Sequence, residues 1–441
     1  MSSRPPGTSL AYRAAVRLGL ALAPAVASRR PKWRDALMAR VGAGRRIVAW
    51  ARENRDPSRA LLWMHAPSVG EGLQAEAVLG VLRERHPDWQ IVYTHTSPSA
   101  GRLAARQPAD LADYLPWDLP GEIEFVLAGL APTALVFCKL DLWPELATRA
   151  AARAVAVGLV AATVSPVSSR LRWPARSLLR AGYAAVRAAG AVADDDAERL
   201  AALGVPGDAI EITGDPRFDS ALHQARSAAG DRRYAVPGDG PALVAGSTWP
   251  ADEAVLLPAF ATVRRSMPEA RLILAPHEPT AEHLALVERR ARSHGLESLR
   301  LSRAGTAGSA ALVIVDRVGL LAGLYAQGRI AFVGGGFGRA GLHSVLEPAA
   351  AGVPVLFGPH WRNSREAGLL LDAEAATTVD ASPPALAAGW MHWLADDGAR
   401  SAAGARALAV VERGQGGAER NARLVEALVT GGRTAGRPDG P

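Results

Sequence analysis

The feature that most constrains the fold is an alternation, beginning at Leu61, of short runs rich in β-forming residues with longer stretches rich in Ala and Leu. Such alternation is typical of a parallel sheet covered by helices on both faces. The candidate strands of the first half are residues 61–65, 91–95, 134–138, 155–159 and 209–213, and those of the second half are 242–246, 271–275, 311–315, 330–334 and 354–358. We therefore predict an α/β protein with two Rossmann-like, doubly wound domains that face a cleft.

A polar, glycine-containing stretch without a steady period separates the two series of strands, at residues 223–240, and is typical of a linker. A chain of 441 residues with 49% hydrophobic content is long enough to bury two cores. The predicted division is an N-terminal arm (1–50), an N-terminal domain (51–222), the linker (223–240), a C-terminal domain (241–430) and a flexible tail (431–441). Ligands of such folds bind at the carboxyl ends of the strands, so the cleft is the predicted site.

The charge of the chain is concentrated at its start. Residues 1–52 contain eleven Arg and Lys and one acid, Asp35, so the net charge of this segment is +10. The net charge of the whole chain is +7, so the remaining residues carry −3. A basic arm indicates an anionic partner, either a phosphorylated lipid surface or a nucleic acid. A general preference for arginine is the alternative, because lysine occurs only at positions 32 and 139. Cys138 is the only cysteine, which excludes a disulfide within the chain and favours a reducing compartment.

An apolar stretch lies within this arm, at residues 10–28, and is interrupted by Arg13 and Arg17. The uninterrupted part is too short to cross a bilayer core of about 30 Å. We predict an interfacial helix whose basic residues lie at lipid headgroups. A signal peptide is the alternative, because Ala25-Val26-Ala27 imitates a cleavage site.

Three segments of the first domain carry candidate catalytic residues. Glu71 follows the first predicted strand, where a carboxylate facing the cleft can accept a proton from an attacking hydroxyl; alternatively, it only complements a helix N-terminus. Lys139 and Asp141 follow the strand at 134–138 and could pair with each other. Arg217 precedes the linker and could reach across the cleft to an anionic sugar or phosphate.

In the second domain the predicted strand at 330–334 runs into a glycine-rich loop, followed by residues 343–347, where we expect a helix to begin. Glycines allow close backbone approach, and helix-start amides favour a phosphate. The alternative is that the glycines only tighten the connection, since their order matches neither the dinucleotide fingerprint nor the Walker loop. Residues 246–249 and 276–279 end two other strands, and His277 there could donate to a phosphate or be a structural polar group.

Taken together, these segments resemble the 3-deoxy-D-manno-octulosonic acid (Kdo) transferase family of lipopolysaccharide synthesis, from about residue 12 to residue 430. The motifs that carry the resemblance are, in order, SVGE, YLPWDLP (114–120), LWPEL (142–146), GDPRFD, GSTWPADE (246–253), APHEP, GGGFGRAGLHSVLEP and GVPVLFGPH (352–360).

The resemblance implies a glycosyltransferase B arrangement and an inverting transfer of Kdo from CMP-Kdo to a lipid A precursor of the lipid IVA type. It also implies no metal and no cofactor. The N-terminal segment would associate with an anionic membrane surface, placing the enzyme peripherally or monotopically at the cytoplasmic face of the inner membrane. We expect no nucleic acid as partner, since the sequence contains no recognisable module for it.

The resemblance also assigns roles in the first domain. Glu71 corresponds to the general base, and Asp141 and Arg217 correspond to residues associated with stabilising the transition state. Arg217 stands where the family usually has lysine, and Lys139 replaces the first glutamate of a Glu-Thr-Glu run, of which Asp141 replaces the second. We assign Ser68, Gly70 and Lys139 to substrate binding.

The predicted nucleotide site lies in the second domain. Its residues are Ser247, Pro276, His277, Glu278, Val318, Gly319, Leu320, Gly335, Gly336, His343, Ser344, Val345, Leu346 and Glu347. His277 stands where many members have arginine, Leu320 where many have glutamate, and Ser344 where many have asparagine. These departures could shift nucleotide affinity or preference.

Three alternatives share the same predicted architecture. They are another two-domain nucleotide-sugar transferase, an enzyme similar to UDP-N-acetylglucosamine epimerases, and a non-catalytic descendant that binds nucleotide or lipid. The fold alone does not separate these functions, because this architecture hosts many of them.

Overall fold

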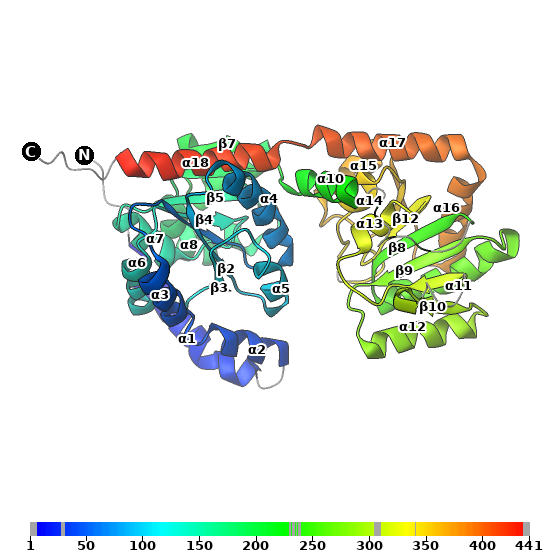
Figure 1. Ribbon diagram of the computed structural model, residues 1–441, viewed down its shortest axis with the longest axis horizontal. Helices are drawn as coiled ribbons and strands as arrows, with labels where there is room; N and C mark the ends of the chain where they lie inside the picture. Colours follow the sequence, from blue (N-terminus) through cyan, green and yellow to red (C-terminus); the bar gives the residue numbers. More distant parts are fainter. Residues whose placement is uncertain are drawn as a thin grey trace, which may run out of the picture. The chain divides into compact units, whose positions relative to one another are not determined.

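The computed structural model describes residues 7–27, 31–228, 231, 234, 236, 240–303, 310–339 and 341–434. The chain forms two compact units (Figure 1). The first contains the chain up to Asp219 and again from Gln415 onward, and the second contains Ser220–Gly414. Each is built on a seven-stranded sheet whose recorded strand pairs are all parallel. The predicted fold class, two Rossmann-like α/β domains, is confirmed.

The sheet of the first unit has the strand order β3-β2-β1-β4-β5-β6-β7. Its strands are β1 (Leu61–His65), β2 (Gln90–His95), β3 (Leu111–Tyr114), β4 (Ala134–Cys138), β5 (Ala156–Ala162), β6 (Ala188–Ala191) and β7 (Ile210–Ile212). Its helices are α1 (Leu10–Ala27), α2 (Pro31–Arg40), α3 (Ala43–Asn54), α4 (Val69–Arg85), α5 (Gly101–Ala104), α6 (Pro120–Leu130), α7 (Pro144–Ala152), α8 (Ala175–Ala184), α9 (Asp194–Leu203) and α18 (Gly417–Thr434). Helix α10 (Arg217–Ala228) begins in this unit and ends in the other.

The central strand β1 shows why this sheet needs helices on both faces. All five of its residues are buried. Because side chains alternate along a strand, Leu61 and Trp63 pack into one apolar core, and Leu62 and Met64 pack into a second core on the opposite face. The first core includes residues of α3, α6 and α7, and the second includes residues of α4 and α18.

The sheet of the second unit has the order β10-β11-β9-β8-β12-β13-β14. Its strands are β8 (Ala242–Thr248), β9 (Arg271–Pro276), β10 (Ser298–Arg300), β11 (Leu312–Ile314), β12 (Ile330–Val333), β13 (Val355–Phe357) and β14 (Ala376–Thr378). Its helices are α11 (Pro250–Ser266), α12 (Ala281–Ser293), α13 (Leu321–Tyr325), α14 (Leu346–Ala350), α15 (Arg365–Asp372), α16 (Pro383–Ala395) and α17 (Asp397–Arg413). Two cores again lie on opposite faces, with Leu243 and Ala245 in one and Val244 in the other.

The predicted domain boundaries differ from the structure at two places. The predicted linker begins at residue 223, but α10 continues through Ala228. The predicted C-terminal domain extends to residue 430, but α18 belongs to the first unit, because Val425, Leu428 and Val429 are buried in that unit's core. Of the predicted tail, residues 431–434 complete α18, and 435–441 lie outside the described residues.

Candidate active site

The strand order of the first unit defines one position where a site is expected. From β1 the chain proceeds to β2 on one side, and it later returns to β4 on the other side of β1. The loops that follow β1 and β4 therefore diverge, which opens space above the carboxyl ends of these strands. Glu71 follows β1, and Lys139 and Asp141 follow β4, so the fold brings these predicted residues to this point.

Glu71 lies in the first turn of α4 and is held by two neighbours. The Ser68 hydroxyl donates to Oε2 of Glu71, and Nζ of Lys139 lies 3.2 Å from Oε1. Burial alone would raise the pKa of Glu71, but the Lys139 charge and the Ser68 hydrogen bond outweigh burial, and the pKa lies below its usual value. The carboxylate is therefore ionised at neutral pH and able to accept a proton. The Glu71 carboxylate also stabilises the N-terminus of α4, which is the role that the alternative interpretation gives it.

A chain of hydrogen bonds holds Asp141. Trp63 Nε1 donates to Thr94 Oγ1 (2.9 Å), which lies 3.1 Å from His65 Nδ1, and His65 Nε2 lies 3.1 Å from Asp141 Oδ2. Since indole only donates, the Thr94 hydroxyl hydrogen can point to Nδ1 of His65, and Nε2 then carries the hydrogen donated to Asp141. His65 is completely buried. His65 was not among the site residues predicted from the sequence, and its one visible signal is its place at the end of an apolar strand.

Asp141 has two further partners. Trp143 Nε1 donates to Oδ2 (3.1 Å), and Nη2 of Arg170 lies 3.6 Å from Oδ1. Burial raises the pKa of Asp141, but the hydrogen bonds from His65 and Trp143 and the charge of Arg170 outweigh it, so the pKa lies below the usual value. Asp141 is thus a second ionised carboxylate at the same sheet edge.

Arg217 is held by a buried carboxylate at the end of β7. Its Nε and Nη2 donate to Asp215 Oδ2 (2.9 and 2.6 Å), and Gln74 donates to Oδ1 (3.0 Å). Gln74 lies on α4, one turn beyond Glu71, and the Cys138 thiol lies 3.4 Å from the Glu71 carbonyl oxygen and 3.8 Å from Gln74 Oε1. The structure therefore connects the predicted residues Glu71, Lys139 and Arg217 through a continuous set of contacts.

In the second unit, three aromatic side chains stack beside the corresponding switch point between β8 and β12. Trp249 lies 4.8 Å from His277 and 6.2 Å from His343 between ring centroids, and the two histidines lie 4.4 Å apart. Trp249 follows β8, His277 follows β9, and His343 follows the loop after β12. His277 and His343 were predicted site residues. Trp249 was noted only as part of the loop at 246–249.

His343 is uncharged at neutral pH. Burial, and then the charge of His277, lower its pKa from 6.5 to about 4. Trp249 Nε1 donates to His343 Nε2 (2.9 Å), so the ring hydrogen lies on Nδ1. His343 is therefore a neutral group able to donate a hydrogen bond from Nδ1.

The glycine loop packs against protein backbone. A Cβ at Gly335, whose φ is +92°, would lie 2.1 Å from the carbonyl oxygen of Gly341, and one at Gly336 would lie 2.7 Å from the amide nitrogen of Gly358. Asp252 joins this loop to the end of β8, since its Oδ2 accepts from Gly335 N (2.9 Å) and Trp249 N (2.8 Å). These contacts explain why positions 335 and 336 require glycine. They agree with the alternative that the glycines only tighten the connection between strand and helix.

The remaining predicted nucleotide residues lie at the ends of β8 and β9, in three loops and at the start of α14. Residues 318 and 319 and Ser344, His277 and Glu278 are exposed, Ser247, Leu320 and Glu347 are half-buried, and Pro276, Val345 and Leu346 are buried. The helix expected at 343–347 begins later, at Leu346, and has only five residues. Ser344 and Val345 therefore precede the helix. Buried Pro276, Val345 and Leu346 can support this region only by packing or through backbone groups.

Neither a metal cluster nor a spanning helix occurs in the part of the chain that the structure describes. No group of three or more His, Cys, Asp or Glu is placed to hold a metal ion there. Likewise, none of the helices described is sufficiently long and apolar to traverse a bilayer. The expectation of a reaction without metal or cofactor stays a prediction.

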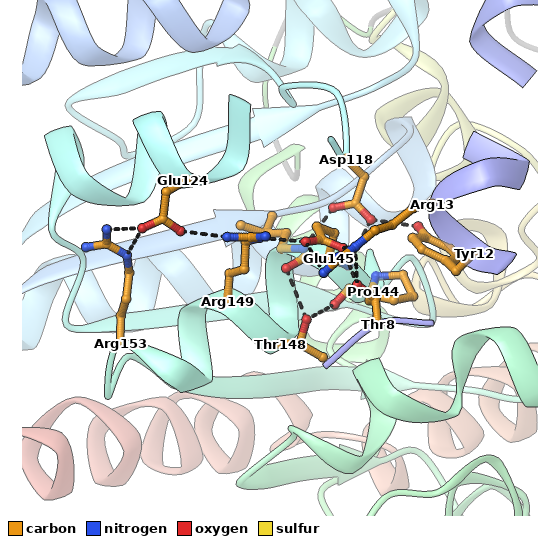
Figure 2. A network of polar contacts seen from close by, with 11 residues as sticks. Thr8, Tyr12, Arg13, Asp118, Glu124, Pro144, Glu145, Thr148, Arg149 and Arg153 are labelled. Carbon is orange, nitrogen blue, oxygen red and sulfur yellow. Dashed lines mark hydrogen bonds and ion pairs between the residues drawn. The ribbon is translucent and has the colours of Figure 1, made fainter. Parts of the chain in front are cut away.

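The N-terminal arm contacts the body of the first unit, which corrects one expectation. Arg13 was predicted to lie at lipid headgroups, but its Nε and Nη2 donate to the buried Glu145 (2.8 and 3.0 Å; Figure 2). A buried carboxylate needs such a partner, so Arg13 turns inward. Arg17 remains exposed, whereas residues 29 and 30 lie outside the described residues.

Two Rossmann-like units in one chain, each with polar loops at the switch point of its sheet, are typical of the glycosyltransferase B fold class. A comparison of structures agrees: UDP-GlcNAc 2-epimerase from Neisseria meningitidis superposes with a TM-score of 0.58 at 12% identity, covering 84% of this chain and 100% of that one. At this identity the likeness shows the fold alone.

Comparisons of sequence identify the family. A family model described as 3-deoxy-D-manno-octulosonic-acid transferase matches residues 37–220. The 3-deoxy-D-manno-octulosonic acid transferase of Bordetella pertussis is 31% identical over 386 residues, covering 84% of this chain and 87% of the relative, and that of Chlamydophila psittaci is 29% identical over 72% and 74%. The chain belongs to the 3-deoxy-D-manno-octulosonic acid transferase family and is a glycosyltransferase.

Proposed function

We propose that the enzyme transfers Kdo from CMP-Kdo to a lipid A precursor of the lipid IVA type, with inversion at the anomeric carbon, in lipopolysaccharide synthesis. Membership of the Kdo transferase family supports the transferred sugar. The observation that carries the mechanism is the ionised Glu71 carboxylate, fixed by Ser68 and Lys139 at the switch point of the first sheet.

In the proposed reaction, Glu71 takes the proton from an acceptor hydroxyl as the oxygen attacks the anomeric carbon. The bond to the phosphate of CMP breaks as the new glycosidic bond forms on the opposite face, and cytidine monophosphate leaves. Asp141 faces the positive charge that develops on the sugar, and Lys139 and Arg217 supply cations for an acidic sugar or phosphate. Ser68 orients Glu71, and Gly70 in the same turn leaves room for the acceptor.

We assign donor binding to the second unit. In this assignment His277 and the Nδ1 hydrogen of His343 contact a phosphate or a base, and Glu347 contacts ribose hydroxyls. The backbone amide of Ser344 would donate to the departing phosphate, whereas the amides of Leu342 and His343 already donate to Asn363 and Gly334. Because α14 has only five residues, its dipole adds little to this effect.

We also propose that the arm holds the enzyme peripherally at the cytoplasmic face of the inner membrane. Leu10, Leu18 and Leu22 are exposed large apolar residues on α1, and Met38 is a fourth on α2. An apolar helix face beside basic residues suits an interfacial position on anionic lipid. The phosphates of the lipid acceptor would then lie in the same surface as the enzyme.

The test is transfer by the purified enzyme. It is incubated with CMP-Kdo and lipid IVA, the lipid product is weighed by mass spectrometry, released CMP is measured, and the anomeric linkage is determined by NMR. We expect mass increments of whole Kdo residues and an inverted linkage. Release of another nucleotide from a different donor, or no lipid product, would contradict the proposal.

Glu71→Gln tests the base. Removal of a general base should lower kcat by about a hundredfold or more while the protein stays folded. Glu84→Gln is the matched control, because Glu84 is an exposed residue near the end of the same helix. Equal rates for Glu71→Gln and the unaltered enzyme would exclude Glu71 as the base.

A further inference from the structure

The segment that carries Asp141 is short and leads directly into a helix. Trp143 donates to Asp141 Oδ2, and α7 begins at Pro144. A shift at the start of α7 is therefore transmitted to Asp141 over a few residues. The contacts at this helix start therefore help to fix where Asp141 lies, in addition to its contacts with His65 and Arg170.

Tyr12 on α1 contacts the cap of α7. Asp118 accepts from the backbone nitrogens of Glu145 (2.9 Å) and Leu146 (2.8 Å), which satisfies the first turn of α7. The Tyr12 hydroxyl donates to Oδ2 of the same Asp118 (2.6 Å; Figure 2). Both Tyr12 and Asp118 are buried. The N-terminal arm thus completes the cap of the helix that follows Asp141.

Arg13 and Thr8 contact Glu145, the second residue of α7. Glu145 is completely buried, and its carboxylate accepts two hydrogen bonds from Arg13 and one from the Thr8 hydroxyl. Arg149 approaches Glu145 from within α7 at 2.5 Å. Figure 2 shows the arm residues converging on Glu145 and Asp118 from one side. A bidentate contact of this kind fixes orientation as well as charge.

Arg40 on α2 holds the tryptophan that donates to Asp141. Its guanidinium carbon lies 4.0 Å from the Trp117 ring centroid and 5.0 Å from that of Trp143. Nε and Nη2 donate to the carbonyl oxygens of Leu115 and Pro116, both at 2.8 Å. Arg40 is buried, so its contacts are shielded from water.

We infer that the N-terminal arm is part of the catalytic apparatus: Tyr12, Arg13 and Arg40 are positioning residues that hold Asp141 through the start of α7 and through Trp143. The inference rests on the proposed function, which takes Asp141 as a group that acts on the substrate. The arm then has a role in the chemical step that is separate from attachment to a membrane.

The test compares Arg13→Gln, Arg13→Lys and Tyr12→Phe in the full-length enzyme, with CMP-Kdo and lipid IVA. We expect Arg13→Gln to lower kcat about tenfold or more, since small misplacement of a catalytic group is costly, with little change in the KM for CMP-Kdo. Arg13→Lys keeps the charge and should restore part of kcat. Binding to vesicles of phosphatidylglycerol and phosphatidylethanolamine should be unchanged. Arg187→Gln is the control, because exposed Arg187 precedes β6 and so lies at the amino ends of the parallel strands, opposite the carboxyl ends where Asp141 lies.

A second comparison separates positioning from general damage. In an Asp141→Asn background, Arg13→Gln should produce no further loss of kcat, because its effect runs through Asp141. An equal further loss in that background, a parallel loss of vesicle binding, or wild-type kcat in both Arg13→Gln and Tyr12→Phe would overturn the inference. Tyr12→Phe removes one hydrogen bond and serves if Arg13→Gln does not fold. Absence of transfer by the unaltered enzyme would instead contradict the proposed function.

Discussion

Lys139 is the residue whose charge acts most directly on the Glu71 carboxylate. Because this cation lowers the pKa of Glu71, Lys139→Met should raise that pKa and leave more of the carboxylate protonated at a given pH. We expect the acid limb of the profile of kcat/KM against pH to move to higher pH. Lys139→Arg keeps the positive charge and should leave the limb near its original position. An unmoved limb in Lys139→Met would show that Lys139 does not set the ionisation of Glu71.

His343 offers a direct titration in the second unit. NMR of histidine-labelled protein should show a pKa of about 4 for His343, and His277→Asn should raise it, because the His277 charge is the second cause of the lowering after burial. A folded-state pKa below the unfolded value of 6.5 means that the stability contributed by neutral His343 is present above pH 6.5. It is lost as the pH falls toward 4. A His343 titration near 6.5 would contradict the half-buried, stacked arrangement.

The sequence points to Glu71, Lys139 and Arg217 as candidate site residues because each follows a predicted strand or lies in a resembling motif. His65 could not be assigned in this way. Its partner Asp141 lies 76 positions further along the chain, and only the pairing of β1 with β4 brings the two together. The stack of Trp249 on two histidines likewise depends on the side-by-side arrangement of three strand ends.

The packing of the glycine loop after β12 can be tested by substitution. Gly335→Ala requires a left-handed backbone conformation and places Cβ against the Gly341 carbonyl, so we expect a loss of stability of about 2 kcal/mol or more in urea unfolding. Gly338→Ala is the matched control, because a Cβ there meets nothing within 4 Å. Its effect should stay within about 0.5 kcal/mol. Equal stability of the two variants would show that the loop is not packed as described.

Most of the strands that the sequence predicted have enough apolar, β-branched residues to be buried on both faces; β7, whose residues are half-buried or exposed, is an exception. The strands β1 and β4 agree residue for residue with the prediction. The missed strands β3, β6, β10 and β14 contain LADY, AAGA, SLR and ATT, which are short, polar or rich in alanine. Three of them, β3, β10 and β14, are edge strands. An edge strand forms because it pairs with its single neighbour, so its sequence need not be a continuous apolar run.

At the scale of the whole molecule, the chain passes between the two units twice. It leaves the first unit near Asp219 and returns at Gln415. The sequence predicted only the first passage, because a glycine-containing polar stretch marks it. The second passage could not be predicted, since an amphipathic pattern shows that α18 has a buried face but does not specify which core receives it.

The return of the chain makes α18 a structural part of the first unit. Its apolar residues Val425, Leu428 and Val429 are buried, and the buried Asn421 accepts hydrogen bonds from Ala161 N and Thr213 Oγ1 at 3.1 Å. Burying three such side chains stabilises the unit by roughly 5 kcal/mol. A chain shortened after Gly414 should therefore lose protection from hydrogen exchange in β5 and β6, which α18 covers, while β8 and β9 of the second unit stay protected. A chain shortened after Thr434 retains α18 and should exchange like the full-length protein. Equal protection of β5 in both shortened chains would mean that the first unit folds without α18. The assignment of α18 to the core of the first unit would then be wrong.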